Sequence, residues 1–181
     1  MVLVVGPTGS GKTTTLYSVM QHAAKPSVKV ISIEDPVEYQ FPGIIQVPIN
    51  PQAQLGFPQA LRTALRADPD VLMIGELRDV ESIEIAQQAA LTGHLVLSQM
   101  HTTHAAAALT RLVEIGAPAM IVSEAMKFVL AQRLVRRVCT DCSTPAALSE
   151  ETLGKLRLSA AAQGLDPSTL ENANFRTAVG C

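Results

Sequence analysis

Aromatic residues are scarce in this sequence: they make up 3% of 181 residues, and tryptophan is absent. Hydrophobic residues nevertheless reach 48% and charged residues only 17%, which excludes a disordered chain and predicts a sizeable core. That core must consist of Val, Leu, Ile, Ala and Met, the residues that fill a parallel sheet covered by helices. We therefore expect an α/β fold.

Other absences exclude whole classes of function. The formal net charge is -2, so the chain has no electrostatic bias toward nucleic acid, and we expect no nucleic-acid partner. No apolar run approaches the roughly 18 residues that span a bilayer, and the opening run lacks the basic lead-in of a signal peptide. Three cysteines suit a reducing compartment better than a disulfide framework. The composition predicts a soluble, intracellular domain.

Patterns of buried strands alternate with helical patterns along the first two thirds of the chain, which predicts a doubly wound parallel sheet. The predicted strands are 2–5, 28–33, 71–74 and 94–99. The predicted helices are 12–24, 57–67, 80–91, 105–115 and 119–130. Residues 34–50, rich in proline and β-formers, are interpreted as a loop with an irregular hairpin. Further on, Ser149-Glu150-Glu151 resembles a helix start, and 164–175 a turn with a short helix.

The stretch "GPTGSGKT", residues 6–13, fits the phosphate-binding pattern G-x-x-x-x-G-K-[ST] at every specified position. Its glycines allow backbone N–H groups to converge on phosphate oxygens, and the following helix adds its positive end. A plain glycine turn is the alternative, but the flanking strand and helix favour a nucleoside triphosphate site. We predict that the nucleotide contacts Gly6, Pro7, Thr8, Gly9, Ser10, Gly11, Lys12, Thr13 and Thr14, with the Thr13 hydroxyl on Mg²⁺.

Acidic residues follow two of the predicted strands, where ligands bind in open parallel sheets. "VLMIGE" ends in Glu76, and "VISIEDPVE" supplies Glu34, with Glu38 four residues later. His101 follows another strand and is placed to sense the γ-phosphate, whereas His104 is interpreted as an ordinary polar residue. Each acid, taken singly, could instead be an ordinary solvent-exposed loop residue. The nearby phosphate loop favours a role at the nucleotide site.

Five motifs in order resemble the secretion and pilus-assembly ATPases of type II secretion and type IV pili. They are "GPTGSGKTTTLYS", "ISIEDPVEYQ", "LRTALRADPDVLMIGELRD", "TGHLVLSQMHTTHA" and "AQRLVRRVCTDC". The resemblance covers residues 2–142 nearly without a gap. The chain departs from the family at Thr103-His104, where Asn-Asp or Thr-Ser is frequent.

The resemblance implies a RecA-like P-loop ATPase that uses ATP and Mg²⁺. It implies that Glu34 positions the attacking water with support from Glu38, that Glu76 binds Mg²⁺ through water, and that His101 reads the state of the γ-phosphate. It further implies a homo-hexamer at the cytoplasmic face of the inner membrane, acting on a membrane platform protein to power type II secretion or pilus assembly.

The family's secretion and pilus-extension members carry a tetracysteine zinc module, and this chain has Cys139, Cys142 and Cys181 at the corresponding place. We expect an ATPase core over 1–138 and an incomplete zinc module over 139–181, with Zn²⁺ bound in the intact parent. A redox-active cysteine pair and unrelated thiols are the alternatives. Four ligands are usual for structural zinc, and only three are present here.

We interpret the chain as a fragment that lacks the family's preceding domains. Those domains supply arginines to the phosphates, so we expect the isolated chain to bind ATP weakly and hydrolyse it very slowly. Two other functions remain as alternatives: a DNA-related P-loop enzyme, which the absence of a basic surface disfavours, and a non-hydrolysing scaffold gated by nucleotide.

Overall fold

A six-stranded sheet organises the first of two compact units, residues 1–134, and a small helix-containing unit follows over 135–181. The computed structural model describes residues 1–170 and 173–181. Within those ranges, no helix combines the length and the hydropathy that a membrane crossing requires. The two units are described separately below.

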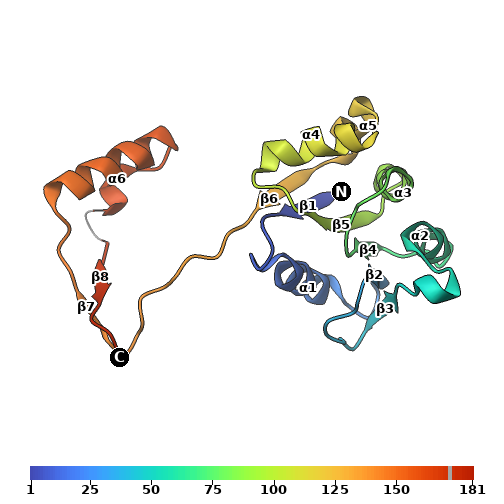
Figure 1. Cartoon of the computed structure of the whole chain (residues 1–181), viewed down its shortest axis with the longest axis horizontal. Helices are drawn as coiled ribbons and strands as arrows, with labels where there is room; N and C mark the ends of the chain where they lie inside the picture. Colours follow the sequence, from blue (N-terminus) through green and yellow to red (C-terminus); the bar gives the residue numbers. More distant parts are fainter. Residues whose placement is uncertain (171–172) are drawn as a thin grey trace. The chain divides into compact units, whose positions relative to one another are not determined.

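The sheet of the first unit is parallel throughout, with strand order β3-β2-β4-β5-β1-β6 (Figure 1). Its strands are β1 (Val2–Val5), β2 (Val30–Glu34), β3 (Ile44–Pro48), β4 (Val71–Ile74), β5 (Leu95–Met100) and β6 (Phe128–Ala131). Its helices are α1 (Lys12–Ala23), η1 (Pro51–Ala53), α2 (Phe57–Leu65), α3 (Val80–Leu91), α4 (Ala105–Ile115) and α5 (Ala119–Ala125). The predicted doubly wound parallel α/β fold is confirmed.

Helices cover both faces of this sheet, as Figure 1 shows. Helix α1 packs on one face through Leu16, Tyr17 and Met20, against strand residues such as Met73 and Leu97. Helices α2 to α5 pack on the other face. Because side chains alternate along a strand, each central strand is apolar on both faces, which explains its nearly continuous hydrophobic run. The sheet is thus covered by apolar packing on both faces.

The predicted helix over 119–130 is wrong in its second half. Helix α5 ends at Ala125, and the next residues form β6, which pairs in parallel with β1 in the register Val2 with Phe128 to Val5 with Ala131. The hydrophobic pattern fits either structure over so short a run. Pairing with the open edge of β1 satisfies the backbone of residues 128–131, and this tertiary interaction decides the outcome.

The irregular hairpin expected over 34–50 is also wrong. Residues 44–48 form β3, which pairs with β2 in parallel, from Val30 with Ile44 to Glu34 with Pro48. The connection over 35–43 therefore crosses over rather than turning back, and it does so without a helix. Its irregular path carries Glu38 over the carboxyl ends of the strands, beside the phosphate loop.

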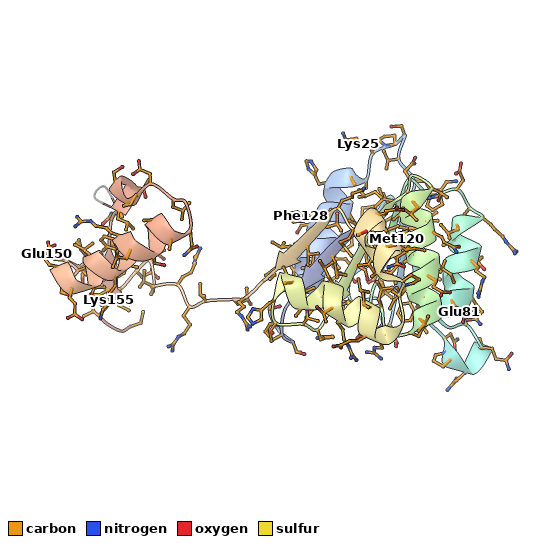
Figure 2. The ribbon with its side chains drawn as sticks, turned by 90° about the horizontal axis from the view of Figure 1, so that it is seen from above. Lys25, Glu81, Met120, Phe128, Glu150 and Lys155 are labelled. Atoms are coloured by element: carbon orange, nitrogen blue, oxygen red, sulfur yellow. The ribbon has the colours of Figure 1, made fainter. Side chains whose placement is uncertain are left out.

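The second unit contains the antiparallel pair β7 (Ser143–Pro145) and β8 (Arg176–Ala178), helix α6 (Glu150–Ala162) and the 3₁₀ turn η2 (Pro167–Leu170). Ser149 caps α6 by accepting a hydrogen bond from the Thr152 N–H, so the predicted helix start is confirmed. The turn expected over 164–175 is present in part as η2, while residues 171–172 lie outside the described residues. Figure 2 shows the side chains of Glu150 and Lys155 along α6, which buries none of its residues.

Candidate nucleotide-binding site

The loop over 6–11 joins β1 to α1 in a shape that only glycine can adopt at several points. Gly6 has a φ of 154° and Gly11, the N-cap of α1, a φ of 83°, a region that side chains disfavour. A Cβ on Gly11 would lie 2.9 Å from the Gln132 side chain. The first turn of α1 leaves its N–H groups without helical partners, and the loop presents them to any bound anion.

Gln132, the residue just after β6, forms hydrogen bonds with this loop and with the elements on either side of it. Its Nε2 donates to the Ser10 carbonyl at 2.7 Å, and its Oε1 accepts from the Thr15 hydroxyl at 2.7 Å. Its own backbone N–H donates to the Val5 carbonyl at 2.8 Å. These three hydrogen bonds tie the loop, the first turn of α1 and the end of β1 to the chain that follows β6. Sequence reasoning missed this residue because it placed the segment just before it in a helix.

Lys12 is 5% exposed and folds its ammonium group back onto the loop. Its Nζ donates to the carbonyls of Gly6 and Pro7, each at 3.0 Å, and lies 3.5 Å from the His101 Nδ1. Burial lowers the pKa of Lys12 from its ordinary value of 10.5, and the Glu76 charge opposes this effect. The ammonium group is therefore poised to exchange two carbonyl partners for phosphate oxygens.

Glu34, the last residue of β2, is 3% exposed and held by three donors. Its Oε2 accepts from the Tyr17 hydroxyl, while its Oε1 accepts from the Ser32 hydroxyl and from the Gln46 Nε2 at 3.1 Å. Burial and the Glu34 hydrogen bond raise the pKa of Tyr17 to about 12. Tyr17 thus remains a donor at neutral pH, and the buried carboxylate is fixed in place.

Glu38 differs from Glu34 in exposure and in partners. Its backbone N–H donates to the Tyr17 hydroxyl at 3.2 Å, but its exposed carboxylate makes no hydrogen bond within the described residues. The residue borders both cavities of the site, one on the phosphate loop and one on the acids. Its carboxylate is free to meet a ligand or a water.

Glu76 follows β4 and lies beside the Arg78 guanidinium and the His101 ring. Its Oε2 lies 2.6 Å from the Arg78 guanidinium and its Oε1 lies 3.8 Å from the His101 Nε2. The carboxylate also raises the pKa of Arg78. Since His101 reaches Lys12 with its other ring nitrogen, Glu76, His101 and Lys12 form one chain of charged and polar groups across the carboxyl ends of the strands.

Two adjoining cavities hold the predicted residues together. The larger, about 510 Å³, is lined by the phosphate loop and the groups facing it: Thr8, Gly9, Gly11, Lys12, Thr13, Thr14, Glu38, Gln99, His101 and Leu134. The smaller, about 60 Å³, is lined by Thr13, Leu16, Glu34, Asp35, Pro36, Glu38, Phe57, Met73, Gly75, Glu76 and Gln99. Of the other predicted loop residues, Gly6 and Ser10 are buried behind the loop, and Pro7 is exposed.

Four residues of this site escaped sequence reasoning: Tyr17, Gln46, Gln99 and Gln132. Tyr17 lies on the buried face of α1, and its position five residues after Lys12 was a usable signal, because that helix face must meet the strand ends. His104, expected to be an ordinary polar residue, is exposed and serves as the N-cap of α4 without a side-chain hydrogen bond.

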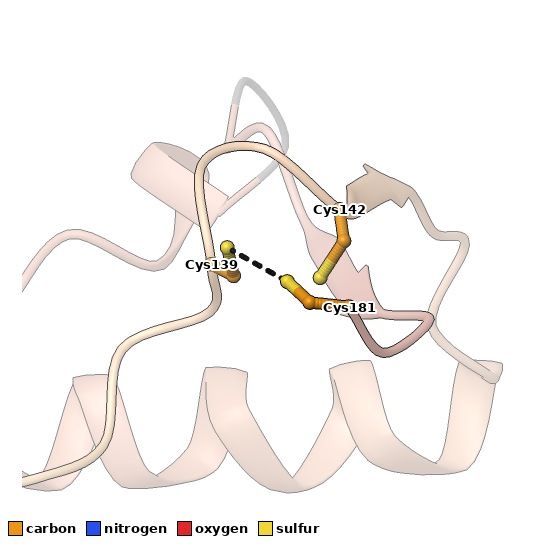
Figure 3. A group of neighbouring side chains, drawn as sticks. All are labelled: Cys139, Cys142 and Cys181. Atoms are coloured by element: carbon orange, nitrogen blue, oxygen red, sulfur yellow. Dashed lines mark hydrogen bonds between the residues drawn. The ribbon is translucent and has the colours of Figure 1, made fainter.

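The three cysteines of the second unit lie together, as Figure 3 shows. Their sulfur atoms are all within 4.8 Å of one another, and the Sγ atoms of Cys139 and Cys181 are 3.6 Å apart. Backbone N–H groups of Cys142 and Asp141, followed by the other thiols, lower the pKa of Cys139 to about 7, while the neighbouring thiols raise the pKa of Cys181. Tetrahedral thiolates around zinc are separated by about 3.8 Å, so this group fits a metal with three ligands.

The parallel sheet, the glycine loop ahead of α1 and the acids at neighbouring strand ends define a RecA-like P-loop nucleotide-binding protein. Residues 1–180 match the family described as "Type II/IV secretion system protein". The chain therefore belongs to this family.

Curated relatives of the chain are named for the same secretion and pilus-assembly systems. The chain is 48% identical over 179 residues to the type IV pilus assembly ATPase PilB of Thermus thermophilus, covering 99% of the chain and 19% of that protein. It is 53% identical over 142 residues to the type II secretion system protein HxcR of Pseudomonas aeruginosa, covering 78% of the chain and 30% of the relative. The chain thus spans about a fifth to a third of the length of these relatives.

A solved structure carries the same fold. The crystal structure of the pilus retraction motor PilT with bound ADP superposes with a TM-score of 0.67 at 32% identity, over 91% of this chain and 53% of that one. This likeness agrees with the predicted resemblance to secretion and pilus-assembly ATPases, which the family match confirms.

Proposed function

We propose that the chain is the ATP-hydrolysing part of a motor that powers type II secretion or type IV pilus assembly. One observation carries the proposal: the phosphate loop, with Lys12 and Thr13, and acids from two neighbouring strands border the same pair of adjoining cavities. Loop amides and an ammonium group stabilise a triphosphate, and carboxylates handle its metal and its water. The family match and the named ATPase relatives support this assignment.

Thr13 and Glu76 are the residues that would hold Mg²⁺, and they fit it. Both line the smaller cavity, and hydroxyl and carboxylate oxygens are the ligands that this ion prefers. Bound magnesium would neutralise charge on the phosphates. The role of Glu76 is to hold the water shell of that ion, and the Arg78 pair keeps its carboxylate oriented.

Two carboxylates share the work on the attacking water. The resemblance assigns the water to Glu34, with Glu38 in support. The hydrogen bonds favour a division in which Glu38, exposed and unpaired within the described residues, contacts the water, and Glu34 fixes Tyr17 beneath it. Tyr17 links the two, because its hydroxyl donates to Glu34 and accepts from the Glu38 N–H. Both residues are therefore needed for hydrolysis, for different reasons.

His101 is proposed to report the state of the γ-phosphate. Its ring lies between Lys12 and Glu76, at 3.5 Å and 3.8 Å. When Lys12 turns from the loop carbonyls to a phosphate, His101 loses one neighbour and remains beside the other. Occupancy of the loop is thereby coupled to the chain segment that leads into α4.

We propose that the protein works as a cytoplasmic homo-hexamer beside the inner membrane, on a platform protein of the secretion or pilus machine. The assignment rests on the family and on relatives named for type II secretion and pilus assembly. Neighbouring domains and subunits then supply the remaining charges to the phosphates, so the chain by itself hydrolyses ATP slowly.

Zinc binding is proposed for the cysteine cluster, with Cys139, Cys142 and Cys181 as three of its ligands. Ser143 is the single buried residue in the described part of the second unit, so this unit has no apolar core to stabilise it. A bound metal would supply the missing stabilisation. Small units without an apolar core are commonly stabilised by a metal. Bound zinc would crosslink the two ends of the unit.

The test of the ATPase proposal is magnesium-dependent release of phosphate from ATP. Lys12→Ala is expected to abolish both nucleotide binding and turnover, because it removes the cation of the phosphate loop. Lys25→Ala is the matched control, since Lys25 is exposed on the chain after α1 (Figure 2). Binding of ATP by the Lys12 variant as tightly as by the control would contradict the proposal.

A further inference from the structure

Gln99 lies at the carboxyl end of β5, on the sheet face that α1 covers. Two residues earlier on the strand, Leu97 packs into the cluster beneath α1, and the alternation of side chains puts Gln99 on that same face. Gly75, which follows the neighbouring strand β4, lines the smaller cavity together with Gln99. The Gln99 carboxamide therefore faces the front of α1, where the phosphate loop begins the helix.

Gln99 is partly buried, and one of its polar atoms is enclosed without a partner in the described part of the chain. Its Oε1 is shielded from solvent and makes no hydrogen bond within the described residues. A buried polar atom left without a hydrogen bond destabilises a protein, so its presence calls for a ligand or water. Ser98, the preceding residue on the opposite face, shows the usual outcome: its hydroxyl donates to the Ile74 carbonyl at 2.8 Å.

Gln99 is one of three residues that line both cavities of the site, together with Thr13 and Glu38. It therefore stands where the triphosphate space meets the acidic space. The smaller cavity, about 60 Å³, has room for a few water molecules, since one needs roughly 10–15 Å³. A carboxamide oxygen accepts hydrogen bonds. A water molecule that donates one proton to this oxygen and the other to the Glu38 carboxylate would be held between the two side chains.

We propose that Gln99 is a catalytic residue that orients the attacking water, an inference that rests on the proposed ATPase function. The Gln99 carboxamide turns its Oε1 toward the cavities and accepts one proton of the water there, and the Glu38 carboxylate accepts the other. The water oxygen forms a bond to the γ-phosphorus as the bond to the β,γ-bridging oxygen breaks. ADP leaves with that electron pair, and the water proton passes to Glu38, giving ADP and inorganic phosphate. In P-loop GTPases, a glutamine likewise orients the water.

The test compares Gln99→Met with Gln88→Met. Methionine keeps the length of the side chain without its hydrogen bonds, and Gln88 is an exposed glutamine of α3 away from both cavities. Thermal unfolding checks that both variants fold. The readouts are kcat and KM for ATP, and the affinities for ADP alone and for ADP with aluminium fluoride, a mimic of the transition state that includes the attacking oxygen.

Gln99→Met is expected to lower kcat and the affinity for ADP–aluminium fluoride by on the order of tenfold or more, and to leave KM and the ADP affinity within twofold. Gln88→Met should change none of these. A wild-type kcat for Gln99→Met, or an equal loss of ADP and ADP–aluminium fluoride affinity, would overturn the inference while leaving the ATPase proposal intact. If the unmodified chain bound no ATP at all, the ATPase proposal itself would fall.

Discussion

Replacing Glu34 and Glu38 separately by glutamine distinguishes the two roles proposed for the acids. Glu34→Gln keeps the shape of a buried side chain but removes its charge. The Ser32 and Gln46 donors both reach one carboxylate oxygen and can keep an amide oxygen as partner. The Tyr17 hydroxyl then faces an NH₂ group, and it cannot turn freely because it already accepts from the Glu38 N–H.

The structure sets the size of each effect. Loss of one hydrogen bond to a charged, buried group destabilises a protein by about 1.5–3 kcal/mol, which is the expected decrease in the free energy of unfolding for Glu34→Gln. Glu38→Gln alters an exposed side chain without a partner in the described residues, so its change in stability should stay within about 0.5 kcal/mol. Both variants should lose about 10²–10⁴ in kcat and keep nucleotide binding.

Tyrosine fluorescence during urea unfolding measures the change in the free energy of unfolding. Both tyrosines, Tyr17 and Tyr39, lie in the first unit with ring centroids 6.3 Å apart, and the chain has no tryptophan, so the signal reports that unit alone. Phosphate release and binding of a fluorescent ATP analogue measure the rest. Near-normal turnover by Glu38→Gln would refute its contact with the water. Unchanged stability of Glu34→Gln would refute the anchoring role of its hydrogen bonds.

Three further predictions follow from the same geometry. Glu76→Gln should bind nucleotide and lose most magnesium-dependent hydrolysis; a magnesium titration with unchanged half-saturation and rate would contradict this. Because burial lowers the pKa of Lys12, ATP affinity should fall as pH rises toward that pKa, at lower pH than for an ordinary lysine at 10.5; a binding titration without this loss would count against the charge of Lys12. Cys139→Ser should lose zinc, measured by metal analysis after dialysis. Zinc affinity of the unaltered chain should decline as pH falls, first because protons compete for the Cys181 thiolate, whose pKa is raised, and below about 7 because they compete for Cys139 as well. Equal zinc content in the serine variant would reject the site.

Much of the fold is predictable because the strongest signals are local. Continuous apolar runs identify β1, β2, β4 and β5, and the spacing of glycines around Lys12 specifies the phosphate loop. The two errors, β3 and β6, concern edge strands. Their residues are only partly buried and carry no clear period, so pairing with β2 and β1 decides their structure.

The candidate site was predictable where a sequence motif identifies its residues, and less so where packing brings residues of different elements together. The sequence places Lys12, Thr13, Glu34 and Glu76 at helix and strand ends, and the structure gathers them around the cavities. The sequence cannot show that three donors bind the Glu34 carboxylate, because one of them, the Tyr17 hydroxyl, comes from another element. Nor can it show that Gln99 lacks a partner.

The central claim is that loop amides and Lys12 hold a triphosphate while Glu76 and Glu38 face its metal and water. A crystal structure of the chain with magnesium and a non-cleavable ATP analogue tests it most directly. The claim predicts the β- and γ-phosphates against residues 9–13, Lys12 on the γ-phosphate, and a water beside Gln99 and Glu38. A nucleotide bound elsewhere, with Lys12 still on the Gly6 and Pro7 carbonyls, would contradict it.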